Sequence, residues 1–445
     1  YLPLRDGESL VEVARSQGRE LNPVIVIPGI LGSRLVDSAH DRVAWGAYGM
    51  GAIRHGSASG RRSLAIPMER SVPLNELRDS VHSDGALRRL QLLPGVNLKA
   101  YDRLLGALSI GGFRPTDTPF PPDDEHLSCF EFGYDWRRSI AENAAALDAF
   151  IKEKRELIHA DQRRRSGTTK PVKFDIIGHS MGGLVARYYL MYGRESLPAD
   201  GSQPVVTWAG KRHVRQVIQV GAPNLGSAVA LMQGRDGVKL FWLFPKFQAA
   251  VIGTLPSVYE LFPRMVDQPV LDADGEVLDI YDPKVWARRG WGLMDPRQDR
   301  YLQQLLPAVD DPAARREIAF DHLSKCLRNA KALHRALDCP CRPPSDVGLH
   351  TFFGHATPTP LRLKDEKGEF ETVEEVPGDG TVPAYSAAAE PRDGSASSIQ
   401  WSSKHSINAS HMMLPIQPEF IREMLPLLLG DKILETSTEN KPAKR

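Results

Sequence analysis

The strongest chemical signal in the sequence is a serine that follows a buried strand and precedes a helix. Residues 174–183 read FDIIGHSMGG and contain the pattern G-x-S-x-G around Ser180. Glycines on both sides of the serine let the chain turn tightly and lift the hydroxyl above the edge of a sheet. A helix that begins there also favours negative charge developing at the serine. The pattern predicts that Ser180 is a nucleophile; a structural tight turn is the alternative.

A serine hydroxyl needs a histidine to take its proton and a carboxylate to orient that histidine. In hydrolases with this turn, the acid and then the base follow the serine along the chain. We expect Asp379, in the sequence PGDGTVP of residues 377–383, to be the acid, with an ordinary Asp-Gly turn as the alternative. Asp272 and Asp274 also lie near a glycine, but in a region that we expect to be an insertion.

Only two histidines follow this aspartate. His411 directly precedes an amphipathic segment, which is where the last loop of such a fold presents its base. His405 is closer to a strand expected at residues 399–402 and is the alternative as a surface residue. We therefore favour His411 as the base.

An ester carbonyl under attack also needs two backbone N–H groups that bind its oxyanion. Met181, directly after the nucleophile, should supply one of them. The other should come from the loop PGILG at residues 28–32, from Ile30 or from its neighbour Leu31. A tight turn is the plain interpretation of this loop, and the two roles are compatible.

Elements must position these residues, and expected strands alternate with expected helices along the chain. Runs of β-branched and aromatic residues bounded by Pro or Gly indicate strands, and longer runs rich in Ala and Leu indicate helices. The alternation predicts an α/β fold with a mostly parallel sheet wrapped on both faces. The strands expected are 24–27, 130–134, 172–177, 214–220 and 349–353, and the helices are 140–158 and 182–192.

Two stretches, 37–75 and 227–345, are too long for ordinary connections and predict cap or lid insertions. We therefore expect a mosaic of core and insertions rather than consecutive domains. The expected division is 1–36 with the first core strand and oxyanion loop, 37–128 as an insertion or membrane-proximal cap, 129–226 as core with the nucleophile, 227–345 as lid or cap, 346–430 as core with the acid and base, and 431–445 as a polar tail.

Composition describes a globular chain and excludes several classes of protein. Of 445 residues, 42% are hydrophobic and 25% are charged, which excludes a disordered chain. The net charge of +1 argues against a nucleic-acid-binding protein, for which a strongly basic surface would be expected. The run Arg163–Arg165 is expected to be a solvated loop. No apolar stretch approaches the roughly 18 residues of a membrane span, and the start at Tyr1 indicates that an N-terminal segment has been removed or omitted.

Four cysteines are too few for a disulfide scaffold in a chain of this length. His322 and Cys326 are four residues apart and would share a helix face, so a metal site is an alternative. A disulfide from Cys326 to Cys339 or Cys341 is favoured over a metal, and unpaired thiols are the third interpretation.

Five motifs in order resemble the lecithin:cholesterol acyltransferase family. They are PVIVIPGILGS at 23–33, YDWR at 134–137, the glycine-rich turn at 178–183, GAPNLGS at 221–227 and GDGTVP at 378–383. The resemblance implies an α/β-hydrolase fold in which Ser180, Asp379 and His411 form the triad. The family's first cysteine pair has no counterpart between residues 33 and 128, so the resemblance gives no support for membrane docking through 37–75.

The same resemblance implies acyl transfer from a phospholipid or neutral lipid to an alcohol or to water, at a membrane surface. The alternatives are a phospholipase or lipase that only hydrolyses esters, and a lipid-binding homologue that has lost catalysis. No metal or cofactor is expected, because the serine itself carries the acyl group. The aromatic cluster Phe241, Trp242 and Phe244 lies where the family carries its lid; buried core is the alternative. A secreted, periplasmic or membrane-associated location is favoured over the cytoplasm, and no nucleic-acid partner is expected.

Overall fold

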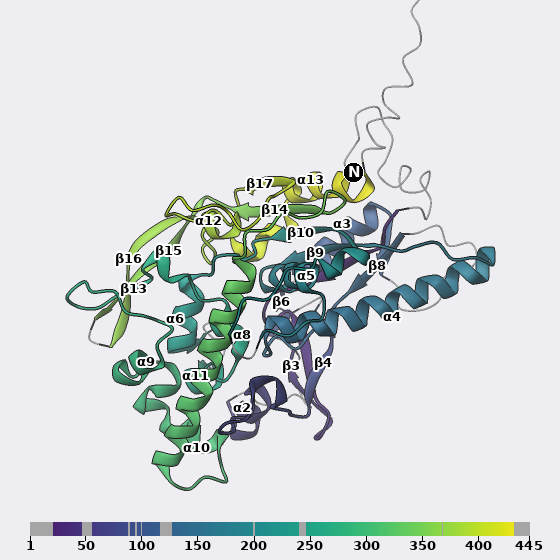
Figure 1. Cartoon of the computed structure of the whole chain (residues 1–445). Coiled ribbons are helices and arrows are strands. Elements are labelled where there is room, and N and C mark those ends of the chain that lie inside the picture. Colours follow the sequence, from purple (N-terminus) through teal and green to yellow (C-terminus); the bar gives the residue numbers. More distant parts are fainter. Residues whose placement is uncertain are drawn as a thin grey trace, which may run out of the picture.

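Seven parallel strands form the central sheet of the computed structural model (Figure 1). The structure describes residues 21–46, 56–87, 90–93, 96–98, 100–115, 127–198, 201–239, 246–366 and 368–430. The sheet order is β17-β14-β10-β9-β1-β8-β7, and every neighbouring pair is parallel. The strands are β1 (Val24–Ile27), β7 (Phe113–Pro115), β8 (Leu127–Glu131), β9 (Phe174–His179), β10 (Val214–Val220), β14 (Gly348–Gly354) and β17 (Ser403–Ile407).

Helices cover both faces of this sheet, so its strands are apolar on both sides. In β1, Val24 and Val26 pack into one cluster, while Ile25 and Ile27 pack into the other, and all four are buried. The first cluster includes α3 (Ala100–Ile110) and α13 (Pro418–Leu429), and the second includes α4 (Ile140–Ser166) and α5 (Met181–Tyr192). Figure 1 shows α3 and α13 above the sheet and α4 and α5 below it, which confirms the predicted architecture.

The helix expected at 140–158 begins at the predicted residue but continues to Ser166. Ser139 and Glu142 form a capping box at its start, and Gly167 ends it with a φ of 72°. The run Arg163–Arg165 therefore belongs to α4, and our expectation of a loop was wrong. Its arginines stay helical because two of them pair with Asp161 one turn earlier.

Two strand boundaries also differ from the prediction. The strand β8 spans Leu127–Glu131, so it lies three residues earlier in the chain than the predicted 130–134. The N–H of Phe132 still donates to the carbonyl of Val26, which continues the parallel pairing with β1 by one bond. No strand forms at 399–402; β17 begins at Ser403 instead. Residues 399–402 precede this strand without being part of it, although the Ser402 N–H still donates to the carbonyl of Leu349 in β14.

A mostly helical cap lies between β10 and β14, on the lower left of Figure 1. Its buried core includes Phe262, Trp286 and Trp291. A three-stranded sheet, β13-β15-β16, joins this cap to the core. The elements are α6 (Ala228–Asp236), β11 (Gly237–Val238), β12 (Phe247–Gln248), α7 (Ala249–Ile252), α8 (Pro256–Glu260), η4 (Met265–Asp267), β13 (Val270–Leu271), α9 (Pro283–Arg289), η5 (Gly292–Met294), η6 (Pro296–Gln298), α10 (Asp299–Leu305) and α11 (Pro312–Leu337), with β15 (Thr357–Glu366) and β16 (Glu369–Gly378) after β14.

Smaller elements complete the described part of the chain. They are β2 (Ser33–Asp37), β3 (Arg42–Trp45), α2 (Ala58–Leu64), η2 (Leu74–Glu76), β4 (Val81–Ala86), β5 (Leu90–Leu93), β6 (Val96–Leu98), η3 (Ala209–Arg212), α12 (Ala384–Ala387) and η7 (His411–Ile416). The sheet β3-β2-β4 follows β1 directly. Since α3 and β7 belong to the core although they lie within 37–128, we propose that the first insertion spans only β2 to β6.

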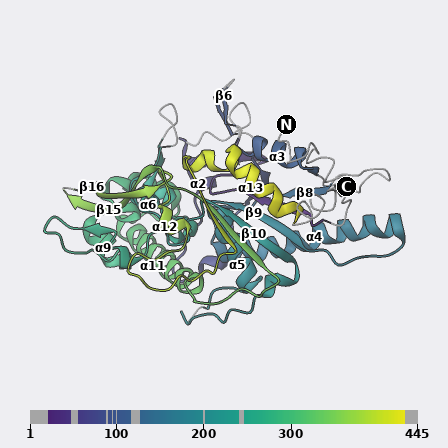
Figure 2. The ribbon, with the colours of Figure 1, turned by 90° about the horizontal axis from the view of Figure 1, so that it is seen from above.

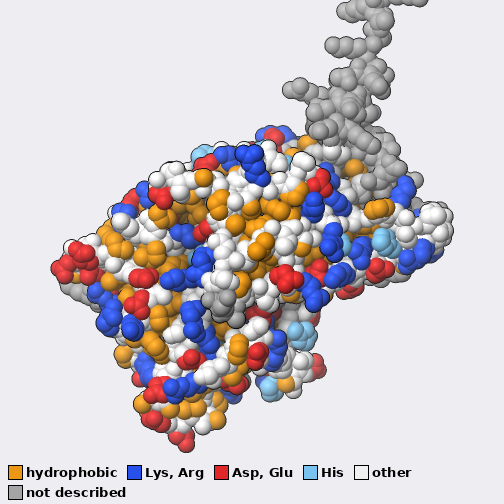
Figure 3. All heavy atoms as spheres, in the orientation of Figure 1, with side chains coloured by type: hydrophobic (Ala, Val, Ile, Leu, Met, Phe, Trp, Pro, Cys, Tyr) orange, Lys and Arg blue, Asp and Glu red, His pale blue; other side chains and the backbone are white. Residues whose placement is uncertain are grey.

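Charges of both signs are interspersed over the surface, with apolar side chains between them, on the face shown in Figure 3. This agrees with the net charge of +1. Figure 2 shows the second view, in which α13 and α3 lie over the parallel strands. Among the described residues, no helix combines the length and the apolar character that a membrane span requires.

Candidate active site

Ser180 stands in a sharp turn between β9 and α5. Its φ of 53° and ψ of −126° are uncommon for a residue other than glycine. A Cβ atom on Gly178 would lie 2.6 Å from the Cα atom of Gly183, and one on Gly182 would overlap with the Pro28 carbonyl oxygen. The glycines of the motif are therefore required by close backbone contacts, and the turn displays the Ser180 hydroxyl at the carboxyl end of β9.

Three side chains from distant parts of the sequence meet at this turn. The Nε2 atom of His411 lies 3.0 Å from Oγ of Ser180, and its Nδ1 atom lies 2.7 Å from Oδ2 of Asp379. Their exposed fractions are 7% for Ser180, 2% for Asp379 and 9% for His411. An ionised carboxylate only accepts hydrogen bonds, so it selects the histidine tautomer that is protonated on Nδ1. The free Nε2 atom then faces the serine hydroxyl.

The main chain holds Asp379 and His411 in this geometry. Asp379 directly follows β16, and its Oδ1 atom accepts the N–H groups of Thr381 at 2.9 Å and Val382 at 2.7 Å. The N–H group of His411 donates to the carbonyl of Asp379 at 2.9 Å. The carboxylate therefore has a fixed orientation, with one oxygen for the turn and one for the imidazole.

The alternative candidates lie elsewhere. His405 is on β17, where its ring stacks on Phe352 with centroids 4.4 Å apart and its Nε2 atom lies 2.7 Å from Oγ of Ser403. Burial lowers the pKa of His405. Asp272 is in a cap turn, where its carboxylate accepts two main-chain N–H groups. Neither residue contacts Ser180.

The loop after β1 forms a tight turn over residues 29–32, closed by a 3.0 Å hydrogen bond from its last N–H to its first carbonyl. Leu31 has a φ of 64°, as the third residue of a type II turn requires. A Cβ atom on the opening glycine would lie 2.9 Å from Cβ of Ser180, so the turn lies against Ser180. In the described part of the chain, the N–H groups of Ile30, Leu31 and Met181 donate to no other group.

Aromatic side chains support this oxyanion turn, by which we mean residues 29–32. The hydroxyl of Tyr134 donates to the carbonyl of Pro28 at 2.9 Å. The indole N–H of Trp45 donates to the carbonyl of Leu31 at 2.8 Å, and that of Trp136 donates to the carbonyl after the turn at 3.2 Å. Two residues of the YDWR motif, Tyr134 and Trp136, thus hold the main chain on either side of the turn.

The arginine of the same motif joins the insertion to the core. Arg137 has an exposed side-chain fraction of 0% and pairs with Asp79 at 2.7 Å and Asp135 at 2.8 Å. Its guanidinium also donates to three main-chain carbonyls. The two carboxylates raise its pKa further above the usual arginine value against the opposing effect of burial, so it is a permanent buried cation.

Sequence reasoning missed two residues beside the triad. The hydroxyl of Tyr101, on α3, lies 2.9 Å from Nδ1 of His179, the residue before the nucleophile. The ring centroids of His179 and His411 are 5.0 Å apart. The glycine-rich turn at 178–183 contains His179, but no local pattern distinguishes Tyr101, because Tyr101 reaches the site only through the packing of α3.

A narrow apolar cavity adjoins the oxyanion turn. Its lining comes from the turn, the YDWR motif and the cap, and includes Ile30, Leu31, Trp136, Phe247, Leu255 and Val258. The predicted lid residues Phe241, Trp242 and Phe244 lie outside the described residues. The turn therefore has an apolar surface next to the groups that would bind an oxyanion.

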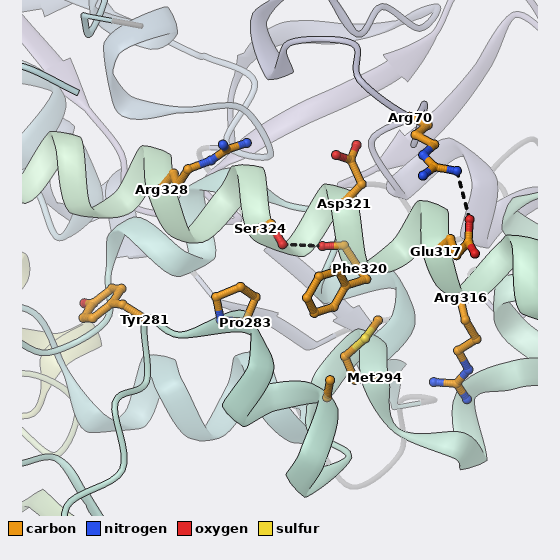
Figure 4. A pocket seen from close by; sticks show the side chains of 11 residues that line it. Arg70, Tyr281, Pro283, Met294, Arg316, Glu317, Phe320, Asp321, Ser324 and Arg328 are labelled. Atoms are coloured by element: carbon orange, nitrogen blue, oxygen red, sulfur yellow. Dashed lines mark hydrogen bonds and ion pairs between the residues drawn. The ribbon is translucent and has the colours of Figure 1, made fainter. Parts of the chain in front are cut away.

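A second, larger concavity of about 810 Å³ lies in the cap between α11 and the segment containing α9 and η5 (Figure 4). Phe320, Met294 and Pro283 form an apolar floor. At one end, Arg70 and Glu317 form a 2.9 Å ion pair. None of the triad or oxyanion-turn residues line this groove.

All four cysteines are free thiols, so the favoured disulfide is not present. Cys326 is fully buried on α11, and burial raises the pKa of its thiol. The Nε2 atom of His322 bonds to the carbonyl of Thr254 at 2.9 Å. Across the described ranges, no three His, Cys, Asp or Glu side chains are grouped as metal ligands would be.

Part of the chain is similar to a known protein family. The model of a family described as lecithin:cholesterol acyltransferase matches residues 126–280. This part of the chain resembles the lecithin:cholesterol acyltransferases. The match contains the turn at Ser180 and three of the five motifs, and it confirms the resemblance predicted from them. It supports, in general terms, an enzyme that acts on lipid esters as a hydrolase or acyltransferase. No curated protein sequence matches the chain.

Among the similar solved structures, one has a TM-score above 0.5 and supports the fold. A chain of the Tle4–Tli4 complex has a TM-score of 0.54 at 17% identity, over 93% of this chain and 98% of that chain. EstA from Clostridium botulinum has a TM-score of 0.36 at 15% identity, over 96% and 92%. Lipase 1 from Pelosinus fermentans has a TM-score of 0.35 at 13% identity, over 95% and 99%. The parallel sheet with helices on both faces is an α/β-hydrolase fold.

Proposed function

We propose that this protein transfers acyl chains from a phospholipid or another lipid ester through an acyl-Ser180 intermediate, to an alcohol or to water. One observation carries the proposal: the continuous alignment of Asp379 Oδ2, the two ring nitrogens of His411 and Ser180 Oγ, with spacings of 2.7 and 3.0 Å. A chance arrangement of three buried polar side chains would not require the strained backbone of Ser180 as well.

In the first half-reaction, the Nε2 atom of His411 accepts the Ser180 proton while Oγ attacks the ester carbonyl carbon. The Asp379 carboxylate stabilises the imidazolium that results. The carbonyl oxygen becomes negative and binds the N–H group of Met181 together with that of Ile30 or Leu31. When the tetrahedral intermediate collapses, the leaving alcohol takes the proton from Nε2, and the acyl group stays on Oγ.

The second half-reaction reverses these steps with a new acceptor. Water or an alcohol gives its proton to Nε2 of His411 as its oxygen attacks the acyl-Ser180 carbonyl, and Oγ regains the proton as the new product leaves. Every proton moves through the same histidine, so the chemistry needs no metal or cofactor. The acceptor depends on whether water or a lipid alcohol reaches the acyl group.

A long-chain acyl group is the substrate feature that the surroundings favour. The cavity beside the oxyanion turn is lined by apolar side chains, among them Leu31, Trp136 and Phe247. Burial of apolar chain there contributes about 0.8 kcal/mol for each CH₂ group. On sequence grounds we also propose that the aromatic cluster Phe241, Trp242 and Phe244 covers the bound chain when the protein acts at a lipid surface.

The test offers the protein liposomes of a phospholipid with a labelled acyl chain, together with a long-chain alcohol, and identifies products by mass spectrometry. Labelled ester on the alcohol is expected for an acyltransferase, and labelled free fatty acid alone for a hydrolase. Ser180→Ala should abolish both products while its thermal unfolding stays cooperative. A fluorophosphonate probe should label the wild type at Ser180. Turnover by purified Ser180→Ala protein, or absence of both turnover and labelling in the wild type, would refute the proposal.

A further inference from the structure

A chain of three buried hydrogen bonds runs behind the candidate active site. The N–H group of Gly29 donates to the hydroxyl oxygen of Tyr101 at 2.9 Å. That hydroxyl lies 2.9 Å from Nδ1 of His179, and Nε2 of His179 lies 3.2 Å from the carbonyl oxygen of His411. Tyr101 is 7% exposed and His179 is 3% exposed, so bulk water does not compete for the polar atoms of these two side chains.

The two ends of the chain determine its direction. The N–H group of Gly29 can only donate, and the carbonyl of His411 can only accept. His179 must therefore carry its proton on Nε2, which leaves Nδ1 as an acceptor for the hydroxyl proton of Tyr101. Each donor meets one acceptor. Burial lowers the pKa of His179 to about 3, so the ring stays neutral and the bond pattern does not reverse near neutral pH.

This chain connects three parts of the site that are far apart in sequence. Gly29 opens the oxyanion turn, His179 precedes Ser180, and the His411 carbonyl belongs to the base. We infer that Tyr101 and His179 are positioning residues that hold the oxyanion turn and the base in register with the nucleophile. The inference rests on the function proposed above and assigns these two residues a role in the same reaction.

Other contacts cannot replace Tyr101. Tyr134 donates to the carbonyl of Pro28, just before the turn, and Trp45 donates to the carbonyl of Leu31 within it, so both contact only acceptor groups. In the described part of the chain, Tyr101 provides the acceptor for the Gly29 N–H group. In a Tyr101→Phe variant, the Gly29 N–H group and Nδ1 of His179 would both be buried without a hydrogen-bond partner. This costs free energy until the turn shifts.

A shifted turn misaligns the oxyanion donors but leaves the acyl cavity intact. Misplacement of catalytic groups by about 1 Å can cost about 100-fold in rate, so we expect kcat for Tyr101→Phe to fall by about 10- to 100-fold. KM should change little, because Tyr101 does not line the acyl cavity. The matched control is Tyr192→Phe, which also loses a buried tyrosine bond, from its hydroxyl to the Ala336 carbonyl at 2.8 Å, at the far end of α5.

The experiment measures kcat and KM separately on a short-chain nitrophenyl ester for the wild type and both variants. A fall in kcat for Tyr101→Phe, with KM unchanged and Tyr192→Phe close to wild type, is expected. Equal kcat values for the two variants, or a change confined to KM, would overturn the inference. If the wild type neither cleaves the ester nor binds a fluorophosphonate at Ser180, the proposed function itself fails. An active wild type with unaffected Tyr101→Phe removes the positioning role alone.

A measurement on the wild type keeps the inference testable if Tyr101→Phe does not fold. With ¹⁵N-labelled histidine, the His179 ring should give the nitrogen shifts of a neutral tautomer protonated on Nε2, unchanged from pH 8 to pH 5. Its signals are assigned by their loss in His179→Gln. A ring protonated on Nδ1 would reverse the deduced bonds and overturn the inference.

Discussion

Replacing Asp379 with asparagine should inactivate the protein without unfolding it. Oδ1 of Asp379 accepts the N–H groups of Thr381 and Val382, while Oδ2 faces Nδ1 of His411 at 2.7 Å. An asparagine keeps both main-chain bonds only with its carbonyl oxygen at the Oδ1 site. Its NH₂ group then donates to Nδ1 of His411, and the proton of the imidazole moves to Nε2. That nitrogen can no longer accept the proton of Ser180.

The wrong tautomer should lower kcat by about 10⁴-fold, the loss caused by the same exchange in a serine protease triad. Because both main-chain bonds persist, the free energy of unfolding should fall by no more than about 1–2 kcal/mol. Asp379→Ala should differ, since it leaves two buried N–H groups without acceptors at about 1–3 kcal/mol each. Hydrolysis of a nitrophenyl ester and urea unfolding measure the two quantities.

The chain offers a matched control for this exchange. Asp272 also accepts two main-chain N–H groups through one oxygen, from Asp274 and Glu276 at 3.0 Å each, but in a cap turn away from Ser180. Asp272→Asn should therefore leave kcat close to the wild-type value, because its carboxylate does not contact Ser180, Asp379 or His411. The reasoning is refuted if folded Asp379→Asn keeps more than about a tenth of the wild-type kcat, or if both asparagine variants lose activity equally.

Two further predictions concern stability. Arg137→Met should lower the free energy of unfolding by about 3–5 kcal/mol, because Asp79 and Asp135 lose a buried partner; a loss below 1 kcal/mol in urea unfolding would show that these carboxylates do not depend on it. Burial lowers the pKa of His322 to about 4, and its unfolded value is about 6.5. The neutral folded form then contributes stability above pH 6.5 that is lost as the pH falls to 4, by about 1.4 kcal/mol per pH unit. His322→Leu should lack this contribution, so a wild-type minus variant difference that stays constant from pH 7 to 5 would contradict it.

Local patterns predicted the elements that carry the site. The strands β1 and β10 occur at the predicted residues, because continuous apolar runs of this length suit a strand buried on both faces. The turn at Ser180 was predictable for a similar reason. Its glycines are required by contacts with residues close in sequence or in the first strand, and such requirements leave a short, contiguous motif.

Two wrong predictions of local structure have different physical causes. The residues 399–402 have the composition of a strand, yet the edge position beside β14 is taken by Ser403–Ile407. The arginines at 163–165 are helical for a local reason: Asp161, in the same helix, pairs with two of them at spacings of three and four residues. The first error therefore came from a distant partner, and the second from a nearby one that the prediction overlooked.

The sequence by itself determined the chemistry of the site: a serine in a strand–turn–helix motif, an aspartate in a glycine-flanked turn and two candidate histidines after it. Only the tertiary structure decided how these groups meet. The hairpin β15–β16 delivers Asp379, η7 directs His411 at Ser180, and α3 brings Tyr101 behind them. The physical reason is that motifs record contacts between neighbours along the chain. Hydrogen bonds between distant segments depend instead on how helices and strands pack, and that packing leaves no contiguous pattern.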